Sequence, residues 1–243
     1  MIRHAPFSVA VLIAALLFSA AEASARQGDR AKVAAEIESL REQIKAKEAQ
    51  LLAPPAEDFE RYAGFLAAPR TGLVRLLPRE SWDGKLTLRG GGAFYSFARR
   101  SHDYNDGPDI ELAQNLFMVG FAGADFGFIT LLGDVPLETV SAETAAVQFM
   151  AAYKAPSTEP EARKGARQFQ PAHTEGSWQY TRAQTVAEGK TYAVRSIVYG
   201  ESDVLVAFRV VGRDLDGSVV LLWKMLKKFP TPSLEGGAPS AGS

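Results

Sequence analysis

The chain has 243 residues, of which 47% are hydrophobic and 23% charged, with a formal net charge of −1. These values are typical of a soluble globular protein and exclude a disordered, collagen-like or multi-span membrane chain. Because the chain has no cysteine, disulfides, iron–sulfur clusters, thiolate zinc sites and a cysteine nucleophile are excluded as well. The near-neutral charge provides no large basic field, so we expect no nucleic-acid partner.

Residues 1–25 have the pattern of a secretory signal peptide. Arg3 gives a positive start, residues 7–21 form an apolar run, and small residues precede a cleavage site after Ala25. This pattern predicts a secreted or periplasmic protein with no transmembrane span after cleavage. The alternative is an uncleaved N-terminal anchor, although the apolar run is shorter than the roughly 20 residues that span a bilayer.

Residues 26–54 predict a helical neck. The stretch 29–52 has no glycine or proline, Asp29 is a candidate N-cap, and Pro54 and Pro55 end the helix. A heptad-like apolar series follows the spacing of a coiled coil and is interrupted at Lys47. The series consists of Val33, Ile37, Leu40 and Ile44. Two interpretations stay open: a coiled coil that forms a homo-oligomer through the 29–52 helix, and an amphipathic helix that packs on its own domain.

Residues 55–230 predict a single α+β domain, and the Pro/Gly/Ser-rich residues 231–243 predict a disordered tail. A short helix is expected over 55–66. Strands are expected over 72–78, 86–88, 93–100, 110–121 and 126–132, helices at 141–155 and 158–169, and strands over 177–186, 190–199 and 204–211. Strands grouped apart from helices indicate a mostly antiparallel sheet with segregated helices, preceded by the long N-terminal amphipathic or coiled-coil helix.

The segment 218–228 predicts a last helix. Its apolar residues fall at helical spacing, and its lysines gather at the C-terminal end, where they would meet the negative pole of a helix dipole. The apolar residues are Val219, Leu222, Trp223 and Leu226, and the lysines are Lys224, Lys227 and Lys228.

Common catalytic motifs do not occur in the chain. Arg89-Gly90-Gly91-Gly92 lacks the Walker lysine, and the glycines at 120, 123 and 127 do not have the G-x-G-x-x-G spacing. Neither a G-x-S-x-G elbow nor an H-E-x-x-H or H-x-H motif is present, which argues against a serine hydrolase and a zinc hydrolase. We interpret the glycine clusters as structural.

The densest polar segment lies between residues 99 and 111. Candidate ligand-binding residues are Arg99, Arg100, His102, Asp103 and Asp106; candidate metal ligands are Asp103, Asn105, Asp106, Asp109 and Glu111. Hard oxygen ligands this dense suit calcium, although the spacing differs from that of an EF-hand loop. Three interpretations stay open: a solvated turn, a calcium or other ion site, and a ligand-recognition loop.

Two further features of this part of the chain have a structural and a functional interpretation. His102 beside Asp103 suggests an acid–base pair, but adjacent residues of an extended chain point to opposite faces, which favours a surface histidine. Phenylalanines at strand spacing favour core positions over an apolar pocket. They are Phe94, Phe97, Phe117, Phe121, Phe126 and Phe128.

The sequence therefore favours an exported, non-catalytic α+β protein that binds a partner or a small ligand. The alternative is a hydrolase that depends on carboxylates or a divalent cation and has its site near the 99–111 loop. No cofactor is expected, unless calcium binds to that loop.

Overall fold

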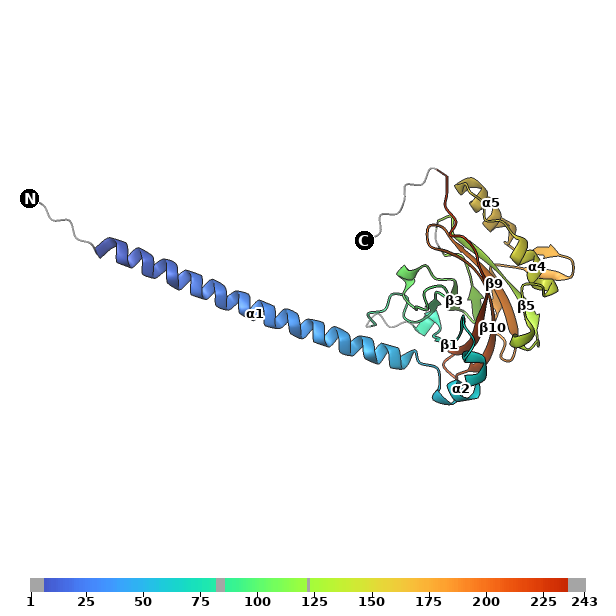
Figure 1. Cartoon of the computed structure of the whole chain (residues 1–243), viewed down its shortest axis with the longest axis horizontal. Helices are drawn as coiled ribbons and strands as arrows, with labels where there is room; N and C mark the ends of the chain where they lie inside the picture. Colours follow the sequence, from blue (N-terminus) through green and yellow to red (C-terminus); the bar gives the residue numbers. More distant parts are fainter. Residues whose placement is uncertain (1–6, 82–85, 122, 236–243) are drawn as a thin grey trace, which may run out of the picture. The chain divides into compact units, whose positions relative to one another are not determined.

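The computed structural model of the chain describes residues 7–81, 86–121 and 123–235 (Figure 1). It divides into two compact units, the first reaching to Ala49 and the second beginning at Gln50. Helix α1 (Phe7–Leu51) runs through Asp29 without a break, so the prediction that the helix starts at Asp29 is wrong. Residues 7–28 are rich in alanine and leucine, which are strong helix formers, and Gly28 alone does not end the helix.

The side chains of α1 are described from residue 27 onward, and they form an amphipathic helix with an exposed apolar stripe. The exposed fractions are 55% for Val33, 45% for Ile37, 50% for Leu40 and 42% for Ile44. The helix ends at Leu51, ahead of the two prolines, as predicted. Across residues 7–81, 86–121 and 123–235, no helix is both long and apolar enough to cross a membrane.

The second unit is built on a five-stranded sheet in the order β1-β11-β10-β9-β5, in which every neighbouring pair is antiparallel. A turn at Gly200 and Glu201, between the strands predicted over 190–199 and 204–211, closes the hairpin between β9 and β10. The strands are β1 (Thr71–Leu76), β5 (Phe126–Gly133), β9 (Thr191–Val198), β10 (Ser202–Arg213) and β11 (Val219–Lys228).

A smaller antiparallel sheet has the order β2-β3-β4-β8. The segment expected as one strand over 110–121 is instead a hairpin, because Gln114 and Asn115 adopt φ values of 50° and 60° and turn the chain back. The strands are β2 (Phe94–Tyr95), β3 (Ile110–Ala113), β4 (Leu116–Met118) and β8 (Ala183–Thr185), and a separate hairpin pairs β6 (His173–Glu175) with β7 (Trp178–Tyr180).

Helices α4 (Ala145–Ala152) and α5 (Glu159–Gln168) occupy the predicted segments, while the helix expected over 55–66 is divided at Tyr62. Its two parts are α2 (Ala56–Arg61) and α3 (Ala63–Leu66). Single 3-10 turns form η1 (Arg79–Ser81), η2 (Tyr104–Asp106) and η3 (Leu137–Thr139).

Two apolar clusters lie on the two faces of the five-stranded sheet, and strand β10 contributes to both. Val206 and Phe208 belong to the cluster beneath the smaller sheet, whereas Leu205 and Ala207 belong to the cluster beneath α4 and α5. This alternation follows from the two-residue period of a strand. The fold is therefore α+β, with antiparallel sheets and helices that cover one face of the central sheet, as predicted (Figure 1).

The predicted last helix over 218–228 is wrong, because this segment is strand β11. It lies between β1 and β10, with Trp223 buried on one face and Leu222 on the other. A run of five apolar residues buried on both faces fits a central strand and a helix equally well by periodicity alone. The lysines interpreted as a helix C-terminus belong to the strand end, where the ammonium group of Lys227 lies 4.6 Å from the centre of the Phe229 ring.

Further expectations differ from the structure, among them the strand expected over 177–186, which is divided into β7 and β8 in different sheets. Leu86–Leu88 is not a strand, and the strand expected over 93–100 ends at Tyr95, because the chain turns back to pair Ser96 with Ser101. Residues 231–235, expected in a disordered tail, are hydrogen-bonded to the domain: the Pro232 carbonyl accepts from the Gly200 amide at 2.8 Å. The rest of the predicted tail, 236–243, lies outside the described residues. Residues 82–85, whose Trp-Asp-Gly-Lys sequence predicts a turn, also lie outside them.

Candidate functional site

The polar segment between β2 and β3 is a compact turn. Oδ1 of Asp103 accepts a hydrogen bond of 2.8 Å from the Asn105 amide and so caps the single turn η2. Gly107 ends the turn at φ 61°, a backbone conformation that favours glycine. Asp106 is half-buried at the end of η2. This arrangement presents Tyr104 and Asn105 on an exposed edge of the domain.

Two residues that sequence analysis considered for chemistry hold the turn in place. Nε2 of His102 lies 2.8 Å from the Arg75 carbonyl oxygen, which requires a proton on Nε2, and burial lowers the pKa of the ring. Asp109 is fully buried and accepts a 2.7 Å hydrogen bond from the Phe97 amide. Burial raises the pKa of Asp109 to about 6, although that hydrogen bond favours the charged form.

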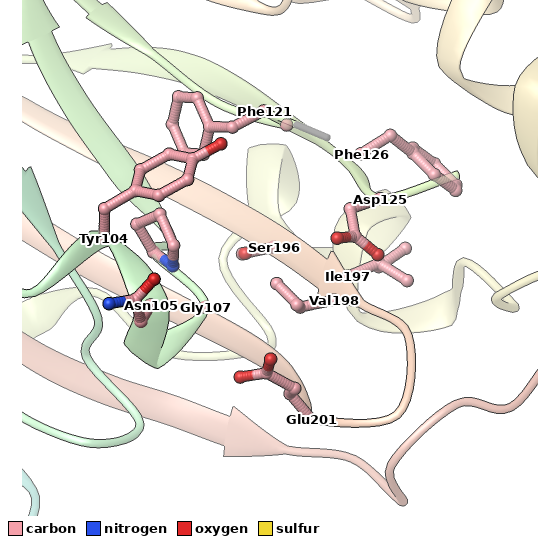
Figure 2. Close-up of a pocket in the computed structure, with 12 residues that line it drawn as sticks. Tyr104, Asn105, Gly107, Phe121, Asp125, Phe126, Ser196, Ile197, Val198 and Glu201 are labelled. Carbon is pink, nitrogen blue, oxygen red and sulfur yellow. The ribbon is translucent and has the colours of Figure 1, made fainter. Parts of the chain in front are cut away.

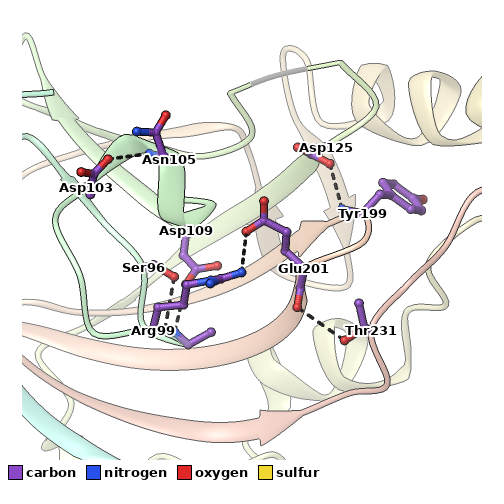
Figure 3. A network of polar contacts seen from close by, with 10 residues as sticks. Ser96, Arg99, Asp103, Asn105, Asp109, Asp125, Tyr199, Glu201 and Thr231 are labelled. Carbon is purple, nitrogen blue, oxygen red and sulfur yellow. Dashed lines mark hydrogen bonds and ion pairs between the residues drawn. The ribbon is translucent and has the colours of Figure 1, made fainter. Parts of the chain in front are cut away.

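Arg99 and Arg100 do not converge on a common point. Nη2 of Arg99 lies 3.4 Å from a carboxylate oxygen of Glu201 (Figure 3). Arg100 turns toward the central sheet, where its guanidinium lies 5.3 Å from the centre of the Trp223 ring and donates to the Thr71 carbonyl. The two residues therefore do not form a shared anion clamp.

The five candidate metal ligands are likewise directed to different places. Asp103 and Asn105 serve the turn, Asp109 lies in the core, and Glu111 forms an ion pair of 2.7 Å with Arg79. Within the described ranges 7–81, 86–121 and 123–235, no group of three or more histidine, aspartate and glutamate side chains lies close enough to hold a metal ion.

Two cavities lined by described residues lie beside this turn; the larger has a volume of about 630 Å³, and we call it the aromatic pocket. Its rings pack edge to face: the ring centre of Phe94 lies 4.9 Å from that of Tyr104 and 5.4 Å from that of Phe121. The pocket is lined by Arg79, Arg89, Gly90, Phe94, Tyr104, Glu111, Met118, Gly120 and Phe121.

Glycines give this pocket its shape. Gly90 has φ 86°, and a Cβ there would meet the ring of Phe94. Gly120 has φ 77°, and a Cβ there would lie 2.8 Å from the Phe126 Cα. Gly90 and Gly120 therefore have a structural role, as interpreted from the sequence: Gly90 lets the chain pass closely beneath the Phe94 ring, and Gly120 lets it pass closely beside the backbone at Phe126.

The charged side chains that line the aromatic pocket differ in whether they form an ion pair. The side chain of Glu111 is only 3% exposed and pairs with Arg79, whose guanidinium also lies 5.8 Å from the centre of the Phe94 ring. Arg89 is exposed and donates to Oδ1 of Asn105 at 3.1 Å. Among the described residues, no carboxylate forms an ion pair with Arg89. In the part of the lining that the structure describes, this guanidinium is therefore the charge that no carboxylate balances.

A smaller cavity of about 140 Å³ adjoins the aromatic pocket and shares Tyr104, Gly120 and Phe121 with it. We call it the acidic pocket, because the carboxyl groups of Asp125 and Glu201 line it (Figure 2). Oδ1 of Asp125 accepts from the Tyr199 amide at 2.8 Å (Figure 3). Burial raises the pKa of Asp125, and the neighbouring charge of Glu201 adds to the effect.

The 99–111 loop could be recognised in the sequence, but most of the residues that surround the two pockets could not. Arg79 and Arg89 lie outside the 99–111 segment, and Asp125 and Glu201 lie between predicted strands. Of the phenylalanines predicted as core, only Phe121 is not fully buried, and it lines both pockets. One sequence signal for the pocket was Arg89 directly before three glycines, because such a run indicates a charged side chain beside a tight turn.

Comparison with known proteins gives no relative from which a role could be transferred. No family model, no curated protein and no solved structure matches the chain.

Proposed function

We propose that the chain is an exported, non-catalytic protein that binds a small ligand in the aromatic pocket. The observation that supports this function is a cavity of about 630 Å³ with aromatic walls and a few charged groups at its edge. Small-molecule sites have this size range, are lined mostly by apolar side chains, and use a few polar groups to orient the ligand.

The non-catalytic part of the proposal follows from how the titratable side chains of the 99–111 segment are used. His102 donates to a backbone carbonyl, and Asp109 is enclosed by the turn that it stabilises. A general acid or base must reach a substrate within hydrogen-bond distance. Neither His102 nor Asp109 lines the aromatic or the acidic pocket.

Binding of a neutral fluorescent probe tests this function. N-phenyl-1-naphthylamine, an uncharged aromatic molecule that becomes fluorescent in apolar surroundings, should bind the chain with saturation. Phe121→Ala should weaken binding by about tenfold, because it removes one ring of the wall. Leu131→Ala is the matched control, since Leu131 is 40% exposed on β5 and lines neither pocket. Equal binding by both variants would contradict the proposed site.

Export is tested by the N-terminus of the protein after expression in a Gram-negative host. We expect the recovered protein to begin at Arg26 and to appear in the periplasm or the medium, because Ala23 and Ala25 fit the cleavage positions. A membrane-bound protein that still begins with Met1 would support the alternative of an N-terminal anchor.

A hydrolase is the second candidate, and the acidic pocket is the observation that favours it. Two carboxyl groups, one of them with a raised pKa, beside an aromatic wall are the groups used in carboxylate-dependent hydrolysis. Release of nitrophenol from nitrophenyl glycosides and esters by the unmodified chain, lost in Asp125→Asn, would support this candidate. Equal background release by both proteins would reject it.

A homo-oligomer through the 29–52 helix is proposed for the first unit. The exposed stripe of α1 supports it, because Val33, Ile37, Leu40 and Ile44 follow heptad spacing and stay uncovered. Light scattering should give a mass larger than a monomer for residues 26–243 and a smaller one for the Leu40→Lys variant. Lys32→Gln, on the same helix but outside the stripe, is the control. A monomeric mass for the parent protein would refute the coiled coil.

A further inference from the structure

We infer that the ligand of the aromatic pocket is a monoanion, with an apolar body and a single carboxylate that Arg89 binds. The inference rests on the proposed function, because it names the chemistry of the ligand for the same pocket. It depends on how three charged side chains of the lining are paired: Arg79, Arg89 and Glu111.

The guanidinium of Arg79, whose side chain is 55% exposed, is already paired with a buried carboxylate, so its charge is balanced within the protein. Its Nη1 lies 2.7 Å from Oε1 of Glu111, whose side chain is 3% exposed. A carboxylate so deeply enclosed needs its partner, since an unpaired buried charge is strongly unfavourable. A ligand that drew Arg79 away would leave Glu111 uncompensated. The ion pair therefore stays in place, and its two charges cancel.

The guanidinium of Arg89 is positioned by a hydrogen bond to a neutral side chain. Its Nη1 donates to Oδ1 of Asn105, a neutral acceptor on the turn that also carries Tyr104. Arg89 lines the pocket, and its guanidinium forms no ion pair with a carboxylate in the described part of the chain. A guanidinium in this position can bind a carboxylate through two parallel hydrogen bonds. The pocket as a whole carries one net positive charge, which matches one negative charge on a ligand.

The apolar lining and the adjoining acidic pocket limit the rest of the ligand. The apolar side chains of the lining are Phe94, Met118 and Phe121, which favour an aromatic or aliphatic body. Past Phe121 the cavity adjoins the acidic pocket with Asp125 and Glu201. A second carboxylate on a ligand that reached the acidic pocket would approach like charges, which is unfavourable. The ligand is therefore a monoanion and not a dianion.

Displacement of N-phenyl-1-naphthylamine by matched competitors at pH 7.5 tests this inference. We expect 4-phenylbutyrate to bind at least about tenfold more tightly than 4-phenylbutanol, because only the carboxylate gains charge-assisted hydrogen bonds from Arg89. High salt should reduce this preference. A second carboxylate at the far end of the ring, as in 4-(3-carboxypropyl)benzoate, should weaken binding, and Asp125→Asn should restore part of the loss.

Variants of Arg89 assign the preference to one side chain. Arg89→Gln should abolish the tenfold preference and leave 4-phenylbutanol unaffected, whereas Arg89→Lys should keep most of it. Arg213→Gln removes the same charge from an exposed residue that does not line the pocket, and it should change nothing. If the probe binds but the acid and the alcohol displace it equally, the anion inference is wrong and the proposed function stands. If the probe does not bind, the proposed function fails.

Discussion

Replacing Asp109 by asparagine should change how the stability of the domain depends on pH. Asp109 is fully buried, and burial raises its pKa from 3.8 to about 6. The native protein therefore holds this proton more tightly than the unfolded chain does. A shift of about two units corresponds to about 3 kcal/mol. This stabilisation is fully present below about pH 4 and is lost as the pH rises through about 6.

Urea unfolding of the parent protein and of Asp109→Asn at pH 4 and pH 7 measures the effect. Asparagine keeps a carbonyl oxygen that can accept from the Phe97 amide, but it does not titrate. The free energy of unfolding of the parent minus that of the variant should therefore fall by about 3 kcal/mol between the two pH values.

Asp134→Asn is a control with the opposite sign. A hydrogen bond from Arg209 lowers the pKa of Asp134, so the parent should gain stability over this variant as the pH rises. The reasoning is refuted if the difference for Asp109→Asn changes by less than about 1 kcal/mol, or if it rises with pH. A rise would mean that the backbone amides at Asp109 outweigh its burial.

Two further predictions concern stability at neutral pH. Asp203→Ala should destabilise the protein by about 3–5 kcal/mol in urea unfolding, because it leaves the guanidinium of Arg195, 1% exposed, without its carboxylate partner. The control Asp134→Ala breaks an exposed ion pair and should have a much smaller effect. Equal effects of the two variants would contradict the assignment of a buried ion pair. Gly72→Ala should lower the free energy of unfolding by about 1–3 kcal/mol, since its Cβ would lie 2.6 Å from a buried indole ring. Gly64→Ala in helix α3 meets nothing within 4 Å and should raise the free energy of unfolding by about 0.5–1 kcal/mol. Effects of the same sign would argue against the close packing at Gly72.

The turn of the candidate site was predictable from the sequence, whereas the pockets were not, because their walls come from distant parts of the chain. Loop chemistry placed a turn at Asp103 and Gly107, because these residue types favour capped and left-handed conformations wherever they occur. The pockets could not be predicted, since their walls come from η1, the glycine turn at 90 and the strand ends around Gly120 and Glu201. Residues so distant in the chain meet only through strand pairing. Whether an arginine such as Arg89 is free depends on which carboxylates reach it.

Sequence by itself determined the α+β class, the strands with clear two-residue alternation and the helix end before Pro54, because these follow from local periodicity and backbone geometry. Only the tertiary structure decided that residues 219–228 form a central strand, because an apolar run satisfies either period until its neighbours β1 and β10 are in place. The tertiary structure also decided that Asp109 is enclosed in the core while Asp125 lines a pocket. Burial depends on what packs over a residue, and residues far away in the chain supply that packing.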